Sequence, residues 1–180
     1  MKNLVIFGGN GIGMIAASIA EELGGYQIKG FLNDELKKDT LIGKYKKYPI
    51  VGSTYDYKHF LLDKNNYFFI AYVGMKNTRG TYEKISGFEI ARKRYATLIH
   101  PTAIIPWDYV EIGDGVLMAP LSQLSPDVSV ADNCIMLGNS FLGHESKMDR
   151  FTHIATNGVV GGNVEIGKGV HVGRDRKSVG

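Results

Sequence analysis

The C-terminal half of this 180-residue chain carries an aliphatic residue or methionine at every sixth position. Apolar residues make up 44% of the chain, so an unbroken run of this length is not an accident of composition. A period of six fits neither an α-helix nor a strand of an ordinary sheet, but it is typical of the hexapeptide repeats of a parallel β-helix. We expect these side chains to form the interior ladder of a solenoid: Ile112, Met118, Leu124, Val130, Met136, Leu142, Met148, Ile154, Val160, Ile166 and Val172.

A second series lies four residues after each ladder position and is mostly small or β-branched. Three hexapeptides make one triangular coil, and successive coils should stack at the spacing of hydrogen-bonded strands, ~4.8 Å. The small residues should fill the interior corners, and the cysteine among them is expected to be core packing. The series is Val116, Ser122, Val128, Cys134, Ser140, Ser146, Thr152, Gly158, Val164 and Val170.

The repeat is irregular at its start and at its end. Ile99 and Ile105 are six apart, but Ile112 follows after seven, so one extra residue near Trp107 shifts the register. After Val172, the segment 173–178 contains two arginines and cannot be an interior turn, because burying an unpaired arginine is costly. Either the solenoid is capped there, or the C-terminal domain, predicted over residues 98–180, is incomplete through truncation or an altered reading frame.

Residues 1–97 follow a different pattern. Apolar runs at 4–7, 28–32 and 67–73 predict strands, residues 12–23 predict a helix that ends at Gly24, and residues 77–94 are mostly helical. This order, with short glycine-rich joints, predicts a small parallel sheet. The expected fold class is therefore an α/β N-terminal Rossmann-like small parallel sheet followed by a left-handed parallel β-helix of hexapeptide repeats.

Charge and cysteine content narrow the classes of function. The net charge is +3, and the densest lysine run, at 37–47, is either a solvated loop or a surface that attracts anionic ligands such as nucleotides. No aromatic residues interleave with it, so we expect no nucleic-acid binding. One cysteine excludes a disulfide within the chain, no segment approaches the ~20 apolar residues of a membrane span, and no signal peptide precedes the first strand. The sequence therefore predicts a cytoplasmic protein.

The first predicted strand ends in a glycine-rich loop, Gly8-x-x-Gly11-x-Gly13. Its spacing differs from the G-x-G-x-x-G dinucleotide fingerprint. Glycines nevertheless let a ligand approach the backbone closely, and the N-terminus of the following helix attracts negative charge. The alternative interpretation is a structural turn and helix start.

Two of the five histidines lie in the regular solenoid at positions suited to chemistry. His144 lies two residues after a ladder position, where side chains face outward, and Glu145 follows it. A carboxylate beside the ring would favour its role as a proton acceptor. His153 lies half a coil later, so the two histidines should point to different sides of the triangle and could meet only across a subunit interface. The alternative for either is a solvated surface residue.

Residues 98–173 resemble the hexapeptide-repeat acyltransferases. The whole chain resembles their sugar-modifying branch, the sialic acid O-acetyltransferase and UDP-4-amino-sugar N-acetyltransferase family. The matching motifs extend along nearly the whole chain and are specific in combination. They are VIFGGNGIG at 5–13, GFLND at 30–34, LIHPTA at 98–103, GHE at 143–145 and the histidine at 153.

The resemblance implies that the protein transfers an acetyl group from acetyl-CoA to an amino group or hydroxyl of a sugar, in cell-surface glycan biosynthesis. It implies that His144 is the general base, assisted by Glu145, and that His153 contacts the thioester region of acetyl-CoA. Gly162, one coil above His144, would lie along the cofactor. No metal is expected, and we predict a homotrimer with cofactor sites between its subunits.

For the N-terminal domain, the resemblance implies a nucleotide or sugar site in the glycine-rich loop, at Gly11, Ile12 and Gly13. Asn33 and Asp34, at the end of the next strand, would belong to the same site. Asp34 would pair with a substrate ammonium or with a ribose hydroxyl.

Two alternative functions remain open at this point. A metal-dependent hydratase of the γ-class carbonic anhydrase kind needs three histidines that converge on zinc. His153 and His171 are eighteen residues apart and should stack, but no close pair of histidines falls on one coil. The second alternative is a scaffold that has lost activity through its irregular tail. The motifs fit both N- and O-acetylation.

Overall fold

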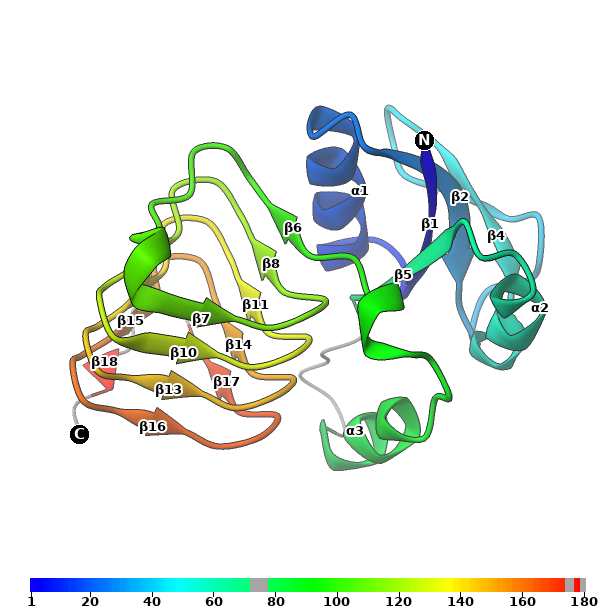
Figure 1. The fold of residues 1–180 in the computed structure, drawn as a ribbon. Coiled ribbons are helices and arrows are strands. Elements are labelled where there is room, and N and C mark those ends of the chain that lie inside the picture. Colours follow the sequence, from blue (N-terminus) through cyan, green and yellow to red (C-terminus); the bar gives the residue numbers. More distant parts are fainter. Residues whose placement is uncertain (72–77, 174–176, 179–180) are drawn as a thin grey trace. The chain divides into compact units, whose positions relative to one another are not determined.

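The computed structural model describes residues 1–71, 78–173 and 177–178, which divide into two compact units. The first unit holds residues 1–71 and 89–96, and the second holds residues 78–88, 97–173 and 177–178 (Figure 1). The end of the third predicted strand, 72–73, and the start of the following predicted helix, at residue 77, lie outside the described residues.

The first unit is built on one five-stranded sheet in the order β3-β4-β2-β1-β5. Neighbours pair in parallel except β3 and β4, which are antiparallel. The three strands expected from sequence, β1, β2 and β5, lie side by side, with β1 between the other two. The predicted parallel sheet is therefore confirmed. The strands are β1 (Lys2–Phe7), β2 (Tyr26–Leu32), β3 (Leu41–Ile42), β4 (Tyr48–Gly52) and β5 (Asn66–Ile70).

Helix α1 (Ile12–Glu22) joins β1 to β2 and buries a face of small residues. A Cβ on Gly13 would lie 2.8 Å from Cε1 of Phe31, so this glycine allows the helix to lie close to the sheet. The helix ends as predicted, because Gly24 takes φ +69° and donates its N–H to the carbonyl of Glu21. The remaining helical turns of this unit are η1 (Thr54–Asp56), α2 (Tyr57–Leu61) and η2 (Arg92–Arg94).

The second unit is a parallel β-helix with three sheets, named here by one central strand each. The β14 sheet has the order β6-β8-β11-β14-β17, the β13 sheet β7-β10-β13-β16, and the β12 sheet β9-β12-β15-β18. Paired residues are eighteen apart, as in Ile135 with His153, so the predicted left-handed solenoid fold is confirmed. Helix α3 (Thr78–Ser86) and the turn η3 (Trp107–Tyr109) complete the unit.

The solenoid strands are two or three residues long, and outward and inward side chains alternate along each strand. They are β6 (Leu98–Ile99), β7 (Val110–Ile112), β8 (Leu117–Met118), β9 (Gln123–Leu124), β10 (Val128–Val130), β11 (Ile135–Met136), β12 (Phe141–Leu142), β13 (Lys147–Met148), β14 (His153–Ile154), β15 (Val159–Val160), β16 (Glu165–Ile166), β17 (His171–Val172) and β18 (Lys177–Ser178).

The interior of the solenoid follows the six-residue ladder. Ladder side chains from Met118 to Val172 are buried, and Ile112 packs against them partly buried. The corner residues are buried from Val116 to Val164, but Val170 is exposed, contrary to prediction. Val170 lies in the last full coil of the described chain, where no described turn stacks on it.

The two irregularities have structural counterparts. The extra residue near Trp107 is taken up by η3, which resets the register before β7. Residues 174–176 of the predicted irregular tail lie outside the described residues, and β18 after them still pairs in register with β15. No helix in the described part of the chain is long and apolar enough to cross a membrane.

Candidate functional site

His144 and Glu145 lie on the turn between β12 and β13, and their side chains are 65% and 63% exposed. Nδ1 of His144 is 3.0 Å from Oε2 of Glu145. An ionised carboxylate only accepts hydrogen bonds, so Nδ1 carries the proton and donates it. In the neutral imidazole this leaves the lone pair of Nε2 available, which is the form that a general base requires.

The backbone of this turn is strained at Glu145, whose φ is +58°. The same left-handed position recurs every six residues, and most of its occupants are glycine, asparagine or aspartate, which tolerate it. Leucine, glutamate and phenylalanine occupy it at three places. The series is Gly115, Leu121, Asp127, Asn133, Asn139, Glu145, Phe151, Asn157, Asn163 and Gly169.

Gly162 lies directly against the imidazole of His144, one coil further along. A Cβ on Gly162 would lie 2.5 Å from Nε2 and 2.6 Å from Cε1 of the ring. A Cβ on Gly143 would lie 2.5 Å from the carbonyl carbon of Gly161. The three glycines therefore keep this corner of the solenoid bare of side chains beside the histidine.

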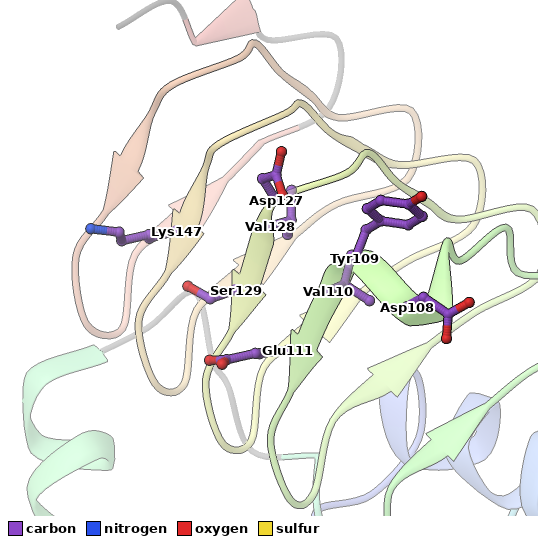
Figure 2. Close-up of a pocket in the computed structure, with 8 residues that line it drawn as sticks. All are labelled: Asp108, Tyr109, Val110, Glu111, Asp127, Val128, Ser129 and Lys147. Atoms are coloured by element: carbon purple, nitrogen blue, oxygen red, sulfur yellow. The ribbon is translucent and has the colours of Figure 1, made fainter.

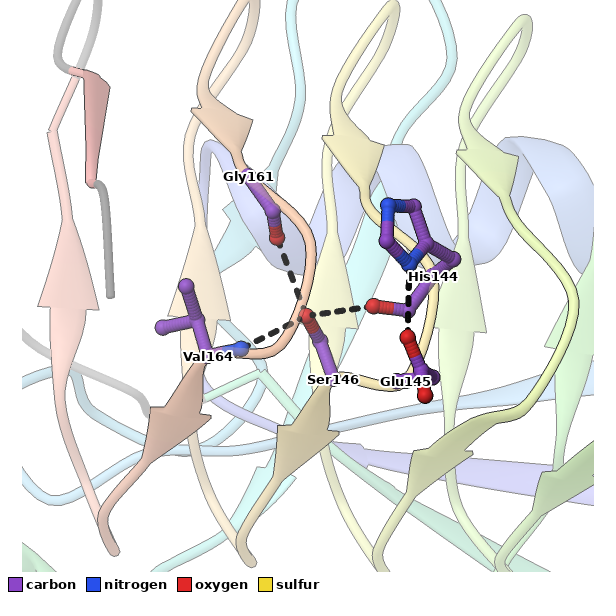
Figure 3. A network of polar contacts seen from close by, with 5 residues as sticks. All are labelled: His144, Glu145, Ser146, Gly161 and Val164. Carbon is purple, nitrogen blue, oxygen red and sulfur yellow. Dashed lines mark hydrogen bonds and ion pairs between the residues drawn. The ribbon is translucent and has the colours of Figure 1, made fainter.

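A buried hydroxyl ties the two turns together (Figure 3). Oγ of Ser146 donates to the carbonyl of Gly161 at 2.9 Å and accepts the N–H of Val164 at 3.0 Å. The carbonyl of His144 accepts the N–H of Asn163 at 2.7 Å. Sequence reasoning assigned Ser146 to corner packing and missed this role. The one available signal was a serine at a position where the coils on either side have valine.

His153 lies on the β14 sheet, away from the turn that carries His144, as the half-coil spacing predicts. Its side chain is only 4% exposed, so the alternative of a solvated surface residue is wrong for this histidine. Nδ1 of His153 lies 3.0 Å from Nδ1 of His171, the rings meet edge to face, and Nε2 is buried without a hydrogen-bond partner. Burial, followed by the charge of His171, lowers the pKa of His153 to about 4.

The histidine pair has no third metal-binding side chain beside it in the described part of the chain. His153 and His171 lie one above the other on adjacent coils, as predicted, but the described residues contain no group of three histidine, cysteine or acidic side chains that could hold a metal ion. Cys134 is buried at an interior corner, and burial raises the pKa of its thiol to about 12. Its thiol donates to the carbonyl of Asp149, so the prediction of core packing is confirmed.

In the first unit, Gly11 immediately precedes α1 and takes φ +81°, and no side chain caps the helix. The N–H groups of Met14 and Ile15 both bond to the carbonyl of Gly11. Ile12 is partly exposed, whereas Gly13 is buried against Phe31 and serves packing. The loop thus combines a structural turn with an open helix N-terminus.

The polar residues at the end of β2 are already engaged with the protein. Nδ2 of Asn33 donates to the carbonyl of Gly8, and its Oδ1 accepts the N–H groups of Glu35 and Leu36. Oδ1 of Asp34 accepts the N–H and the hydroxyl of Thr54 at 2.8 and 2.9 Å. These contacts shape the loop after β2, and a substrate contact to Asp34 would have to share its oxygens with Thr54.

A shallow pocket of about 540 Å³ lies on the outer face of the β13 sheet (Figure 2). It contains none of the residues predicted from sequence. Its lining is mostly charged or polar, which describes a solvated sheet face: Asp108, Tyr109, Val110, Glu111, Asp127, Val128, Ser129 and Lys147.

Comparison with known proteins agrees with this architecture. Residues 3–84 match the family model of the PglD N-terminal domain. For this part of the chain the match agrees with the resemblance seen in the sequence. The chain is also similar to the acetyltransferase domain of PglB from Neisseria gonorrhoeae FA1090, with a TM-score of 0.56 and 21% identity over 97% of this chain and 93% of that one. The same domain in complex with acetyl coenzyme A gives a TM-score of 0.52 and 20% identity, over 95% of this chain and 92% of that one. At these identities the structures show a shared fold along nearly the whole chain.

Proposed function

We propose that this protein is an acetyltransferase that moves an acetyl group from acetyl-CoA to an amino group or hydroxyl of a nucleotide-activated sugar. The observation that carries the proposal is the arrangement at the solenoid corner. Nδ1 of the exposed His144 is hydrogen-bonded to the carboxylate of Glu145, and its Nε2 lies beside the backbone of Gly162. The PglD-type N-terminal region and the gonococcal acetyltransferase domain support the same assignment.

The chemistry is direct transfer. His144 accepts a proton at Nε2 from the sugar amine or hydroxyl as that group attacks the acetyl carbon. Glu145 orients the ring and stabilises the imidazolium that forms. No serine or cysteine is needed as a covalent carrier, and the only cysteine is buried with a raised pKa. The attack forms a bond from the sugar nitrogen or oxygen to the acetyl carbon, and the carbon–sulfur bond of acetyl-CoA breaks. CoA leaves as a thiolate, which takes up the proton that His144 accepted.

The corner residues suit a thioester cofactor. Bound acetyl-CoA would supply an activated acetyl group. The gonococcal domain binds acetyl coenzyme A on this fold. Gly143, Gly161 and Gly162 leave an edge on which an extended chain can lie without meeting a Cβ. Gly162 is therefore proposed to lie along the cofactor beside His144.

His153 is also proposed to contact the cofactor, but because its side chain is buried we expect only a limited contact. With 4% of the residue exposed, only an edge of the ring could reach a ligand. His153→Ala should then raise the KM for acetyl-CoA more than it lowers kcat. A drop in kcat with an unchanged KM would contradict this role.

The sugar nucleotide is assigned to the first unit. The open N-terminus of α1 at Gly11 and Ile12 is suited to a phosphate, and Asn33 and Asp34 flank the end of the neighbouring strand. Asp34→Ala should weaken sugar-nucleotide binding and leave acetyl-CoA binding intact. Because Asp34 also anchors Thr54, Thr54→Val is the matched variant that removes the hydroxyl bonds but keeps the carboxylate.

We further propose a homotrimer that packs through the β12 sheet. The outward residues of this sheet include Gln123, Phe141 and Val159, and Ile104 forms a bridge to Gln123 at its edge; Phe141 is partly exposed, and Val159 and Ile104 are exposed. The β13 sheet instead presents Glu111, Ser129, Lys147 and Glu165, with Lys147 paired to Glu165 at 2.9 Å. The β12 sheet thus presents more apolar surface than the β13 sheet, which favours subunit packing over solvent, and the turn with His144 borders that face.

The proposal is tested by thermal shift and turnover with acetyl-CoA, nucleotide-activated 4-amino sugars and free sialic acid. Stabilisation by acetyl-CoA together with acetylation of one sugar class supports it. Zinc-dependent hydration of carbon dioxide would favour the hydratase, and absence of binding by every ligand would favour an inactive scaffold.

A further inference from the structure

Ser146 lies at the interior corner behind His144, and its side chain is fully buried. Its hydroxyl bonds to both ends of the turn in the next coil, donating to Gly161 and accepting from Val164. This is the turn against which the imidazole of His144 lies. The hydroxyl therefore connects the base of the catalytic turn to the surface under Nε2.

Packing alone does not require a hydroxyl at this corner. Val128 and Val164 occupy the same position in the coils on either side, and both are buried. Ser140 gives the contrasting case, because its Oγ is equally buried but has no hydrogen-bond partner. Cys134 and Thr152 each donate to the carbonyl fifteen residues ahead, as Ser146 does. Among these corners, Ser146 has the additional bond from a backbone N–H.

We propose that Ser146 is a positioning residue for the acetyl transfer assigned above, and the inference rests on that proposed function. Its hydrogen bonds to Gly161 and Val164, with a longer contact of 3.4 Å from Oγ to the carbonyl of His144, fix the turn at residues 161–164 relative to His144. They thereby set the position of Nε2 along the glycine edge beside which the thioester would lie. Loss of the hydroxyl leaves the Gly161 carbonyl and the Val164 N–H without this partner, so the turn moves to find others.

The reason for an effect on rate is geometric. The contact between His144 and Gly162 has no slack, since even a Cβ would not fit there. A base must lie within hydrogen-bond reach of the proton that it removes, and a displacement of ~1 Å can cost about 100-fold in rate. A shift of the His144 ring by a few tenths of an ångström should therefore lower kcat. Most substrate contacts do not involve this ring, so the KM values should change little.

The test compares Ser146→Ala with Ser140→Ala in the full chain. Ser146→Ala should lower kcat about tenfold with both KM values nearly unchanged, and Ser140→Ala should leave both parameters at wild-type values. Ser146→Thr, which keeps a hydroxyl like that of Thr152, should restore most of kcat. The inference is overturned if Ser146→Ala turns over like Ser140→Ala, or if Ser146→Thr is as slow as Ser146→Ala while remaining folded.

A second readout does not depend on activity. Diethylpyrocarbonate modifies histidine nitrogens, and peptide mass spectrometry gives the rate at His144. Ser146→Ala should increase that rate relative to wild type and to Ser140→Ala, because the turn no longer lies firmly against Nε2. Equal rates in all three proteins would overturn the positioning role. If wild type lacks acetyl transfer, the proposed function fails, and the modification rates still decide the role of Ser146.

Discussion

The Cα of Gly162 approaches the imidazole of His144 so closely that a methyl group there would lie 2.5 Å from Nε2. The two residues come from adjacent coils and are eighteen positions apart, so the stacking of the solenoid itself creates the contact. A histidine at one corner thus requires a glycine at the same corner of the next coil. This pair is the part of the site that the fold determines most directly.

Gly162→Ala should lower kcat strongly and change the melting temperature little. The new Cβ must displace the ring of His144 from its place, because the backbone on the other side is held by the hydrogen bond from Asn163 to the His144 carbonyl. Gly167→Ala is the matched control, since a Cβ there has nothing within 4 Å. Steady-state kinetics and thermal melts of both variants check this. Equal kcat for the two alanine variants would contradict it.

Glu145→Asn should stabilise the fold while it impairs catalysis. Glutamate in the left-handed conformation is strained by ~1 kcal/mol, and asparagine tolerates that conformation better. The melting temperature should rise by about 2–4 °C, and kcat should fall because Nδ1 of His144 loses its carboxylate. Leu121→Asn, at φ +60°, is the control that should gain stability without loss of rate. A lower melting temperature for Glu145→Asn would contradict the inference that the backbone is strained at Glu145.

Stability should decrease in acid because of His153. Burial, and then the charge of His171, lower the pKa of this histidine from 6.5 to about 4. The unfolded chain takes up a proton near pH 6.5 but the folded chain does so only near pH 4, so the contribution is full above pH 6.5. It is lost as the pH falls from 6.5 towards 4, by up to about 3 kcal/mol.

The check is urea unfolding of wild type and His153→Leu at pH 7 and pH 5. Leucine suits this position, because Leu117 and Ile135 occupy it in the two preceding coils and are fully buried. The leucine variant should lose less stability between the two pH values than wild type does. Parallel losses would mean that His153 does not carry the pH dependence.

A trimer should form in solution, and a charge on the β12 sheet should break it. Phe141→Asp places a carboxylate on the outer face of that sheet, next to Val159. Light scattering should give about three times the chain mass of 19.8 kDa for wild type and a smaller species for the variant. Ser129→Asp, on the polar β13 sheet, should remain a trimer. A stable wild-type monomer at micromolar concentration would refute the assembly.

The interior of the solenoid could be predicted from sequence because its period is geometric. Each ladder residue from Met118 to Val172 is inside, and His144 faces outward two residues after one of them. The elements β3, β4 and α2 had no such period and lay in the stretch that the sequence left unassigned. Two-residue strands and single turns depend on tertiary pairing more than on local pattern.

The side-chain environment was the least predictable part. The sequence places His153 at an outward position of the solenoid, where a side chain is expected to face solvent. In the β14 sheet, however, the outward residues Leu117, Ile135 and His153 are all buried. Asn33 and Asp34 carry the polar atoms expected of a ligand site, but their bonds to Gly8 and Thr54 depend on a fold that brings distant residues together. The left-handed corner series was visible in the sequence as glycine, asparagine or aspartate at every sixth position, interrupted at Leu121, Glu145 and Phe151, and of these three interruptions only Glu145 belongs to the site.

The central claim is that His144 removes a proton during acetyl transfer. The most direct measurement is kcat for His144→Ala against Lys147→Ala, an exposed neighbour on the same coil, as a function of pH with an amino-sugar substrate. His144→Ala should lower kcat by about 10²–10⁴-fold with a nearly unchanged melting temperature, and the deficit should shrink as the pH rises and more of the amine is already neutral. Wild-type turnover in a folded His144→Ala protein would contradict the account and return this histidine to an ordinary surface residue.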